Sequence, residues 1–201
     1  MKVFFTADEH YGHENARTGW GDPAKARPFV SLENMREELI ARHNAVVGKG
    51  DEVWHLGDMF WRTLSGLDAA EIVLRLNGKH CYVLGNHEER MRNVNKYSYP
   101  YRCFQEVNER WQMHLPSSLL THSASEPASK PAHRLIILDH YAGRVWAGSH
   151  RGSWQLHGHS HGMLCDIGLL QMDVGVDCNN FAPVSLEQVS AFMRKRELGA
   201  C

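Results

Sequence analysis

The sequence predicts an α/β fold, and three features of the chain support this prediction. In the first half, apolar runs typical of strands alternate with amphipathic helical patterns, which indicates a parallel sheet with crossover helices. In the second half, short apolar runs follow one another with little helix between them, which indicates a mixed or antiparallel sheet. The 201 residues, of which 43% are hydrophobic, are enough to bury a core, and we expect a single domain over residues 1–201.

The first half is expected to have the order β-α-β-α-β. Its strands are predicted at three apolar runs, residues 3–5, 53–56 and 82–84. A polar, glycine-containing loop is expected through Phe29, followed by a helix that Ser31 caps and Gly48 ends. A second helix is expected to open at Asp68 and to end at Gly78, because Asn-Gly is a good C-terminal signal.

The second half is expected to contribute strands and one terminal helix. The predicted strands are residues 107–114, 119–122, 135–138, 154–157 and 170–176. Residues 123–131 form a polar segment that we interpret as a loop rather than a domain linker. Ser185 and Gln188 match a capping box, which predicts a helix that runs to about Arg196.

Composition narrows the class of protein. The net charge is -1, and Lys and Arg form no basic stripe, so a long nucleic acid or a membrane surface is not indicated as a partner. The five cysteines are scattered without a CxxC pair, which argues against a disulfide framework and a thiolate zinc site. We see neither a signal-type N-terminus nor about 20 consecutive apolar residues, and we therefore expect a cytoplasmic protein.

Five short clusters of metal-ligand residue types punctuate the chain, and four of them directly follow predicted strands. The clusters are Asp8-Glu9-His10, Gly57-Asp58, Gly85-Asn86-His87-Glu88, Asp139-His140 and His157-Gly158-His159. Ligands at the carboxyl ends of neighbouring strands converge on one crevice of an open α/β sheet. Carboxylate, imidazole and amide groups suit Mn²⁺, Fe and Zn²⁺, and the lack of thiolates favours an open, catalytic site.

The spacing within these clusters suits a pair of ions. Asp8 and His10 alternate along an extended segment and can bind one ion from the same side, and His157 and His159 can do the same around Gly158. Two ions about 3.5–4 Å apart need a bridging group, which is usually a carboxylate. Asp58 is placed for that bridge.

The five clusters in this order resemble the pattern of the calcineurin-like metallophosphoesterases: D-x-H, GD, GNH followed by D or E, a lone H, and GHxH. The resemblance extends over about residues 3–177 and is greatest to small bacterial and phage members, which share His140-Tyr141 and Val174-Gly175-Val176-Asp177. It implies two packed mixed sheets flanked by helices, in a four-layer α/β/β/α sandwich.

The resemblance also implies a ligand set and a mechanism. The first ion would have Asp8, His10, Asp58 and His159, and the second Asp58, Asn86, His140 and His157. Mn²⁺ is the metal expected to support activity, with Fe, Zn²⁺, Ni²⁺ and Mg²⁺ as alternatives. A water or hydroxide bridging the ions would attack phosphorus in line. His87 would face the scissile phosphate and protonate the leaving oxygen, with Glu88 as a partner.

Several assignments stay open at this point. His122 is the alternative to His140, because it also follows a strand-like run. Glu9 either tunes the site or faces solvent. Substrate-binding candidates are Asn15 and Arg144, with His13, Arg27 and His150 as further ones; each is otherwise a surface charge or a packing contact. His43, His55 and His80 receive no role, and His55 is expected to be a core or edge histidine.

The leading hypothesis is a dinuclear phosphoesterase that hydrolyses phosphodiesters, phosphomonoesters or both. A small phosphate ester or a nucleotide is preferred as substrate. The alternative in the same class is a nuclease or cyclic-nucleotide phosphodiesterase. Candidates for stacking on a base are Trp20, Trp61, Trp146 and Trp154, but buried packing or an exposed loop tip is the preferred interpretation of each. The alternative of another class is a catalytically inactive binding module on the same fold. The sequence does not predict the oligomeric state.

Overall fold

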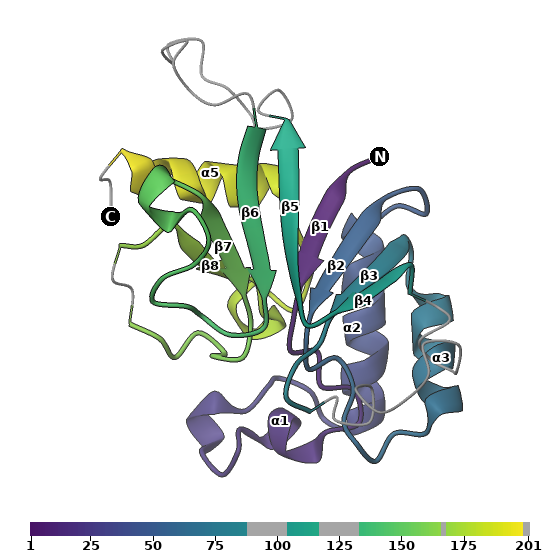
Figure 1. Ribbon diagram of the computed structural model, residues 1–201. Coiled ribbons are helices and arrows are strands. Elements are labelled where there is room, and N and C mark those ends of the chain that lie inside the picture. The colour runs from purple at the N-terminus through teal and green to yellow at the C-terminus, as the bar shows by residue number, and fades with distance from the viewer. Residues whose placement is uncertain (88–103, 117–132, 166–167, 199–201) are drawn as a thin grey trace.

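Two β-sheets packed face to face form the centre of the computed structural model, with helices beside them (Figure 1). The structure describes residues 1–87, 104–116, 133–165 and 168–198. Both sheets are mixed, as each contains parallel strands and one antiparallel strand. The expected α/β architecture of two mixed sheets with flanking helices is therefore confirmed.

The first sheet has the order β4-β3-β2-β1-β9. Its strands are β1 Val3–Thr6, β2 Glu52–Leu56, β3 Lys79–Val83, β4 Glu106–Asn108 and β9 Val184–Ser185. Strands β1 to β4 are parallel and β9 is antiparallel. Helix α2, Leu32–Val46, connects β1 to β2, and α3, Gly66–Arg75, connects β2 to β3. The predicted β-α-β-α-β order is confirmed.

The second sheet has the order β5-β6-β7-β8. Its strands are β5 Arg110–Pro116, β6 His133–Asp139, β7 Trp154–His157 and β8 Gln171–Asp173. The single strand expected at 107–114 is in fact two strands in two sheets, because Asn108 pairs with Val83 whereas Arg110 pairs with Asp139. The strand expected at 119–122, the loop at 123–131 and His122 lie outside the described residues.

The helix ends follow the capping residues. Ser31 caps α2 and accepts a hydrogen bond from the N–H of Asn34, as expected. Helix α3 begins earlier than predicted, because Ser65 is its cap and accepts from the N–H of Asp68. The predicted capping box opens α5, Leu186–Glu197. A short helix, α1 Glu14–Thr18, replaces part of the expected loop. None of the helices in the described part of the chain is long and apolar enough to cross a membrane.

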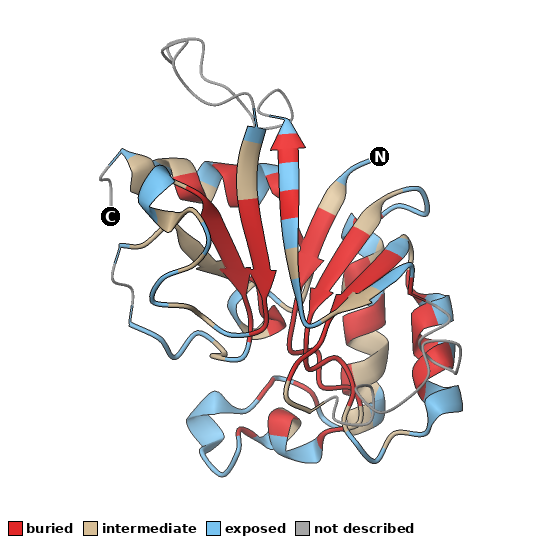
Figure 2. Ribbon diagram, viewed as in Figure 1, coloured by how far each residue is buried: buried red, intermediate tan, exposed pale blue. Residues whose placement is uncertain are grey.

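Much of β1, β2, β3, β6 and β7 is buried (Figure 2), and the two larger hydrophobic clusters of the described residues lie on the two faces of the first sheet. Phe5 and Leu56 of the first sheet pack with Ile136 and Leu156 of the second, and α5 adds Val189 to this core. On the other face of the first sheet, side chains of α2 and α3 pack over Tyr82. They are Met35, Leu39 and Ile40 of α2 and Ile72 and Val73 of α3. The cores therefore fix the carboxyl ends of the parallel strands at one edge of both sheets.

Ile136 tests the contribution of the core between the sheets. Its side chain is 0% exposed and lies on β6 among residues of both sheets. Ile136→Val is expected to lower the free energy of unfolding by about 0.5–1.5 kcal/mol and Ile136→Ala by about 2–5 kcal/mol, because each deletion leaves a larger cavity. Denaturant unfolding measures both values, and exposed Val30→Ala is the control. Equal, small losses in all three variants would contradict this core.

Candidate metal centre

The candidate ligands follow the carboxyl ends of strands in both sheets. Asp8 comes after β1, Asp58 after β2, Asn86 after β3, His140 after β6 and His159 after β7. These strands are parallel to their neighbours within each sheet, so their carboxyl ends meet at one edge. The sequence clusters are brought together here, as their positions after strands predicted.

The backbone of the centre is bent into an uncommon conformation. Eight described residues other than glycine have a positive φ, and five of them are here: Asp8 (60°), His10 (53°), Asp58 (55°), His159 (66°) and His161 (46°). Non-glycine residues rarely adopt this left-handed region, and such residues gather at functional sites. The bends turn short side chains toward one point.

Two donor sets lie on either side of Asp58. In the first, donor atoms of Asp8, His10 and His161 all lie within 4.8 Å of one another, and in the second those of Asp58, His140 and His159 do so. The same holds for a third group, His10, Asp58 and His87, which overlaps both sets. Asp58 Oδ2 lies 4.0 Å from His10 Nε2 and 3.4 Å from His140 Nε2. Asp58 therefore belongs to the second set, and its contact with His10 and His87 links it to the first.

Asn86 belongs to the second set. Its Oδ1 lies 3.1 Å from His140 Nε2, and its amide oxygen can serve as a further ligand. His140 Nδ1 donates to the carbonyl of Leu56, 2.8 Å away, which leaves Nε2 directed at Asp58. A histidine held in this way through one ring nitrogen presents the other to a metal.

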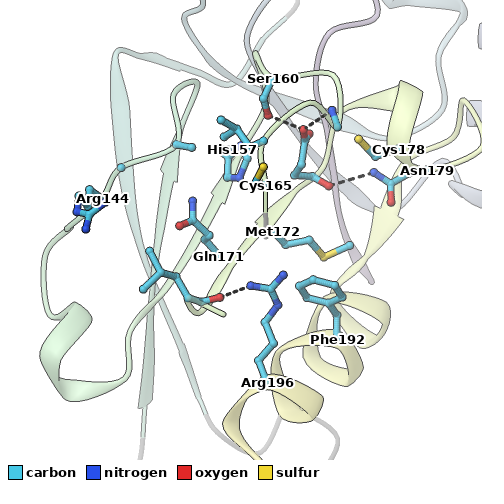
Figure 3. A pocket seen from close by; sticks show the side chains of 16 residues that line it. Arg144, His157, Ser160, Cys165, Gln171, Met172, Cys178, Asn179, Phe192 and Arg196 are labelled. Atoms are coloured by element: carbon cyan, nitrogen blue, oxygen red, sulfur yellow. Dashed lines mark hydrogen bonds between the residues drawn. The ribbon is translucent and has the colours of Figure 1, made fainter. Parts of the chain in front are cut away.

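His157 is not part of either set, which corrects its expected place at the second ion. It is the last residue of β7, and its Nδ1 lies 3.0 Å from the carbonyl oxygen of Gly158. The side chain lines a separate cavity of about 540 Å³ with Gln171 and Phe192 (Figure 3). The strand fixes the direction of this side chain, whereas residues after Gly158 are free to turn toward Asp58.

The histidines of the two sets are displaced by two residues along the chain from the expected ones. His159 lies in the second set rather than the first, and His161, which the sequence analysis missed, lies in the first set. A signal for His161 was present. The letters Gly158-His159-Ser160-His161 also match the Gly-His-x-His order, two residues further along.

Two glycines allow the loops to approach so closely. A Cβ atom on Gly57 would lie 2.4 Å from His140 Nδ1 and 2.7 Å from Gly85 Cα. On Gly158 it would lie 2.6 Å from Asp8 Oδ2. Any side chain at either position would displace a candidate ligand, because real Cβ contacts are longer than these distances.

The electrostatics of the donors fit a cation. Burial, together with the nearby charge of Asp58, raises the pKa of Asp8 well above its usual value. Burial alone would raise the pKa of Asp58 and lower that of His140. The hydrogen bond and the attraction between the two side chains act in the opposite sense, so the pKa of Asp58 is held low and that of His140 is raised to about 9. His10 Nε2 is buried and has no hydrogen-bond partner among the described residues. A divalent ion would offset the buried carboxylates and satisfy this nitrogen.

Arg27 supports the ligands, although it also lines the cavity beside the donor sets. Its buried guanidinium binds both carboxylate oxygens of Asp177, at 2.8 and 2.7 Å, and donates to the carbonyls of Asp8 and Glu9. Asp177 Oδ2 in turn lies 2.7 Å from His161 Nδ1. Burial opposes its ionisation, but the bond to His161 and the Arg27 charge hold the pKa of Asp177 at about 2. Asp177 therefore orients His161, and Arg27 fixes the backbone of the segment that carries Asp8.

Of the other expected substrate contacts, His13 lies beside the centre, whereas Asn15 and Arg144 lie away from it. His13 is buried, stacked 3.6 Å from the ring of Trp61, and its Nδ1 lies 3.5 Å from His10 Nδ1. Asn15 is exposed on α1 and lines neither of the two cavities described. Arg144 lines the cavity of His157. The structure therefore does not bring Asn15 or Arg144 to the donor sets.

A cavity of about 610 Å³ opens beside the donor sets. His87 lies at this opening with 30% of its side chain exposed and its Nε2 3.6 Å from Asp58 Oδ2. The N–H of His87 donates to Asp58 Oδ1, and Trp61 packs edge-on against its ring. Trp20, Lys25, Met163 and Phe181 also line this cavity. Glu88, the expected partner of His87, lies outside the described residues.

Comparisons with known proteins show the family and the fold. Residues 1–163 match the family model of the calcineurin-like phosphoesterases. The uncharacterized protein MJ1445 of Methanocaldococcus jannaschii is 25% identical over 203 residues, which cover 96% of this chain and 92% of MJ1445. The crystal structure of AQ665 from Aquifex aeolicus, a protein of unknown function, matches with a TM-score of 0.64 at 19% identity, over 95% of this chain and 98% of that one. The similarity to AQ665 shows the fold.

Replacing His157 or His161 tests the donor sets. We expect the intact chain to take up two divalent ions, His161→Ala to retain about one, and His157→Ala to retain both, because only His161 lies among the donors. Elemental analysis of Mn²⁺-loaded protein after gel filtration measures the stoichiometry, and circular dichroism checks the fold. Loss of an ion in His157→Ala but not in His161→Ala would restore the placement expected from sequence.

Proposed function

Because this chain belongs to the calcineurin-like phosphoesterase family, we propose that it hydrolyses phosphoric esters with two bound divalent metal ions. The observation that carries the proposal is the meeting of two nitrogen and oxygen donor sets at one buried carboxylate, Asp58. Ions held there would polarise a phosphoryl group and lower the pKa of a water molecule. Mn²⁺ is the proposed metal, with Fe, Zn²⁺, Ni²⁺ and Mg²⁺ as alternatives, and a cytoplasmic location remains a prediction.

The two sets divide the ligands between the ions. The first ion would be held by Asp8, His10, Asp58 and His161, and the second by Asp58, Asn86, His140 and His159. Every member is a carboxylate, imidazole or amide, and the described residues near these sets include no thiolate ligand. This donor chemistry supports an open catalytic site over a closed structural one.

His87 is the residue proposed to handle the proton. Its imidazole is partly exposed at the cavity while its backbone is tied to Asp58, so it faces the space in which a bound ester would lie. From there Nε2 can donate a proton to the leaving ester oxygen. His13, stacked on Trp61, packs beside His87 and limits the directions that this ring can take.

A nucleotide phosphodiesterase is the second candidate, and the position of Trp20 favours it. The Trp20 ring is 40% exposed, lines the cavity and lies 4.4 Å from the ring of His161. Trp20 also has a φ of 50°, a strained value for a bulky residue. An aromatic ring held at this distance from the donors can stack on a nucleobase. The net charge of -1 supports a small nucleotide over a long nucleic acid.

Ester hydrolysis tests the main proposal. Chelator-stripped protein is expected to hydrolyse chromogenic p-nitrophenyl mono- or diesters only after Mn²⁺ is added, and Asp58→Asn is expected to be inactive because both sets lose their shared carboxylate. His87→Ala should lower turnover about 10²–10⁴-fold for alkyl leaving groups. The loss should be smaller for p-nitrophenolate, which leaves without a proton.

Other outcomes have definite meanings. Equal turnover of alkyl esters by His87→Ala and the intact chain, with metal content unchanged, would contradict the role of His87. Bound metal without hydrolysis of any ester would favour the catalytically inactive binding module.

Trp20 is tested with two diesters that release the same p-nitrophenolate. One retains a thymidine 5′-phosphate and the other a methyl phosphate. Trp20→Ala is expected to lower kcat/KM for the thymidine ester alone, by a factor of about 5–150, because stacking contributes about 1–3 kcal/mol. Trp20→Phe should retain most of the activity. An equal loss on both esters would show that Trp20 supports the ligands rather than the base.

A further inference from the structure

Glu9 stands between two ligands in sequence but points away from them. Asp8 and His10 direct their donors into the centre, whereas the Glu9 carboxylate turns to His55 of β2, with Oε1 2.8 Å from His55 Nδ1. Glu9 is only 4% exposed. The sequence left open whether this carboxylate faces solvent, and its burial corrects that alternative.

The Glu9 carboxylate is held by a chain of buried polar groups. Its Oε1 accepts from the Thr6 hydroxyl at 3.2 Å and lies 2.8 Å from His55 Nδ1. His55 Nε2 lies 3.0 Å from His80 Nδ1, and His80 Nε2 lies 3.5 Å from the carbonyl oxygen of Leu76. The chain therefore runs from the ligand segment across β2 and β3 to the end of α3. His55, expected to be a core or edge histidine, lies in the core and is fully buried.

Burying this network costs free energy, and its presence in the core is explained if it fixes one geometry. A buried carboxylate must be compensated by partners, and Glu9 Oε2 has no hydrogen-bond partner among the described residues. Polar groups in a core are poor sources of stability, and their best attested use is to specify one arrangement. The arrangement at stake here is the left-handed backbone of Asp8 and His10.

The segment is held from two directions. Arg27 donates to the carbonyl oxygens of Asp8 and Glu9 from one side, and His55 holds the Glu9 side chain from the other. We propose that Glu9, held by His55 and His80, is a positioning residue that keeps Asp8 and His10 in the geometry that binds metal. The proposal rests on the proposed metal centre.

His43 provides a matched control within the same cluster. It is also buried, and its ring lies 6.2 Å from that of His55 and 5.7 Å from that of His80. Its Nε2, however, donates to the carbonyl of Asn77 at 2.9 Å and not to Glu9. Removing this imidazole perturbs the same part of the core without releasing the Glu9 carboxylate.

Metal affinity distinguishes positioning from general packing. We expect Glu9→Ala and His55→Ala to bind Mn²⁺ about 10–100-fold more weakly than the intact chain, since orienting partners of ligands have effects of this size. Glu9→Gln keeps an acceptor for His55 and should stay within about threefold, as should His43→Ala. Electron paramagnetic resonance of free Mn²⁺ measures the dissociation constants. Intact affinity in folded Glu9→Ala, or an equal loss in His43→Ala, would overturn the proposal.

A second measurement needs neither metal nor activity. The N–H groups of Asp8 and His10 donate to the carbonyls of Gly57 and Asp58, each at 3.0 Å. Their hydrogen exchange in metal-free protein should accelerate in Glu9→Ala and His55→Ala but not in His43→Ala, because only the first two release the segment. Unchanged exchange in Glu9→Ala would refute positioning even if the intact chain proved to hydrolyse no ester, so the two proposals fail separately.

Discussion

The carboxylate of Asp58 is the point at which both sheets and both donor sets meet. It follows β2, in the middle of the first sheet, yet it lies 3.4 Å from His140 of the second sheet. Its other oxygen accepts from the backbone of His87. One buried acid therefore sets the separation of the donor sets and the position of the proposed proton donor, and any change in the packing of the two sheets acts on it directly.

Contacts in the rest of the structure offset the free-energy cost of forming that centre. Left-handed backbone at bulky residues costs about 1–3 kcal/mol each, and buried carboxylates add a desolvation cost. The hydrophobic cores on both faces of the first sheet supply rigidity, but apolar contacts do not determine the direction in which an imidazole or a carboxylate points. Direction comes from hydrogen bonds that reach the ligands from behind, such as Leu56 to His140 and Asp177 to His161. Packing thus fixes where the loops are, and polar contacts fix where their side chains point.

The sequence predicted features that depend on local chemistry. Capping residues located α2 and α5, and ligand types after strands located Asp8, Asp58 and His140. It could not place features that depend on where a strand ends or on distant partners. His157 and His159 have the same residue type, and only the end of β7 at His157 decides which of them turns toward Asp58. The pairing of Arg27 with Asp177 joins residues 150 positions apart, and no periodicity marks it.

The segment from Gly19 to Arg27 takes part in two features of the site, the cavity and the first ligand cluster. Trp20 and Lys25 line the cavity, whereas Arg27 binds the carbonyls of two residues in the first ligand cluster. The intervening turn is tight, since a Cβ on Gly19 would lie 2.2 Å from the carbonyl oxygen of Asp22. The chain between Gly19 and Arg27 therefore folds back closely on itself. One short segment thus contributes both to the wall of the cavity and to the support of the ligand backbone.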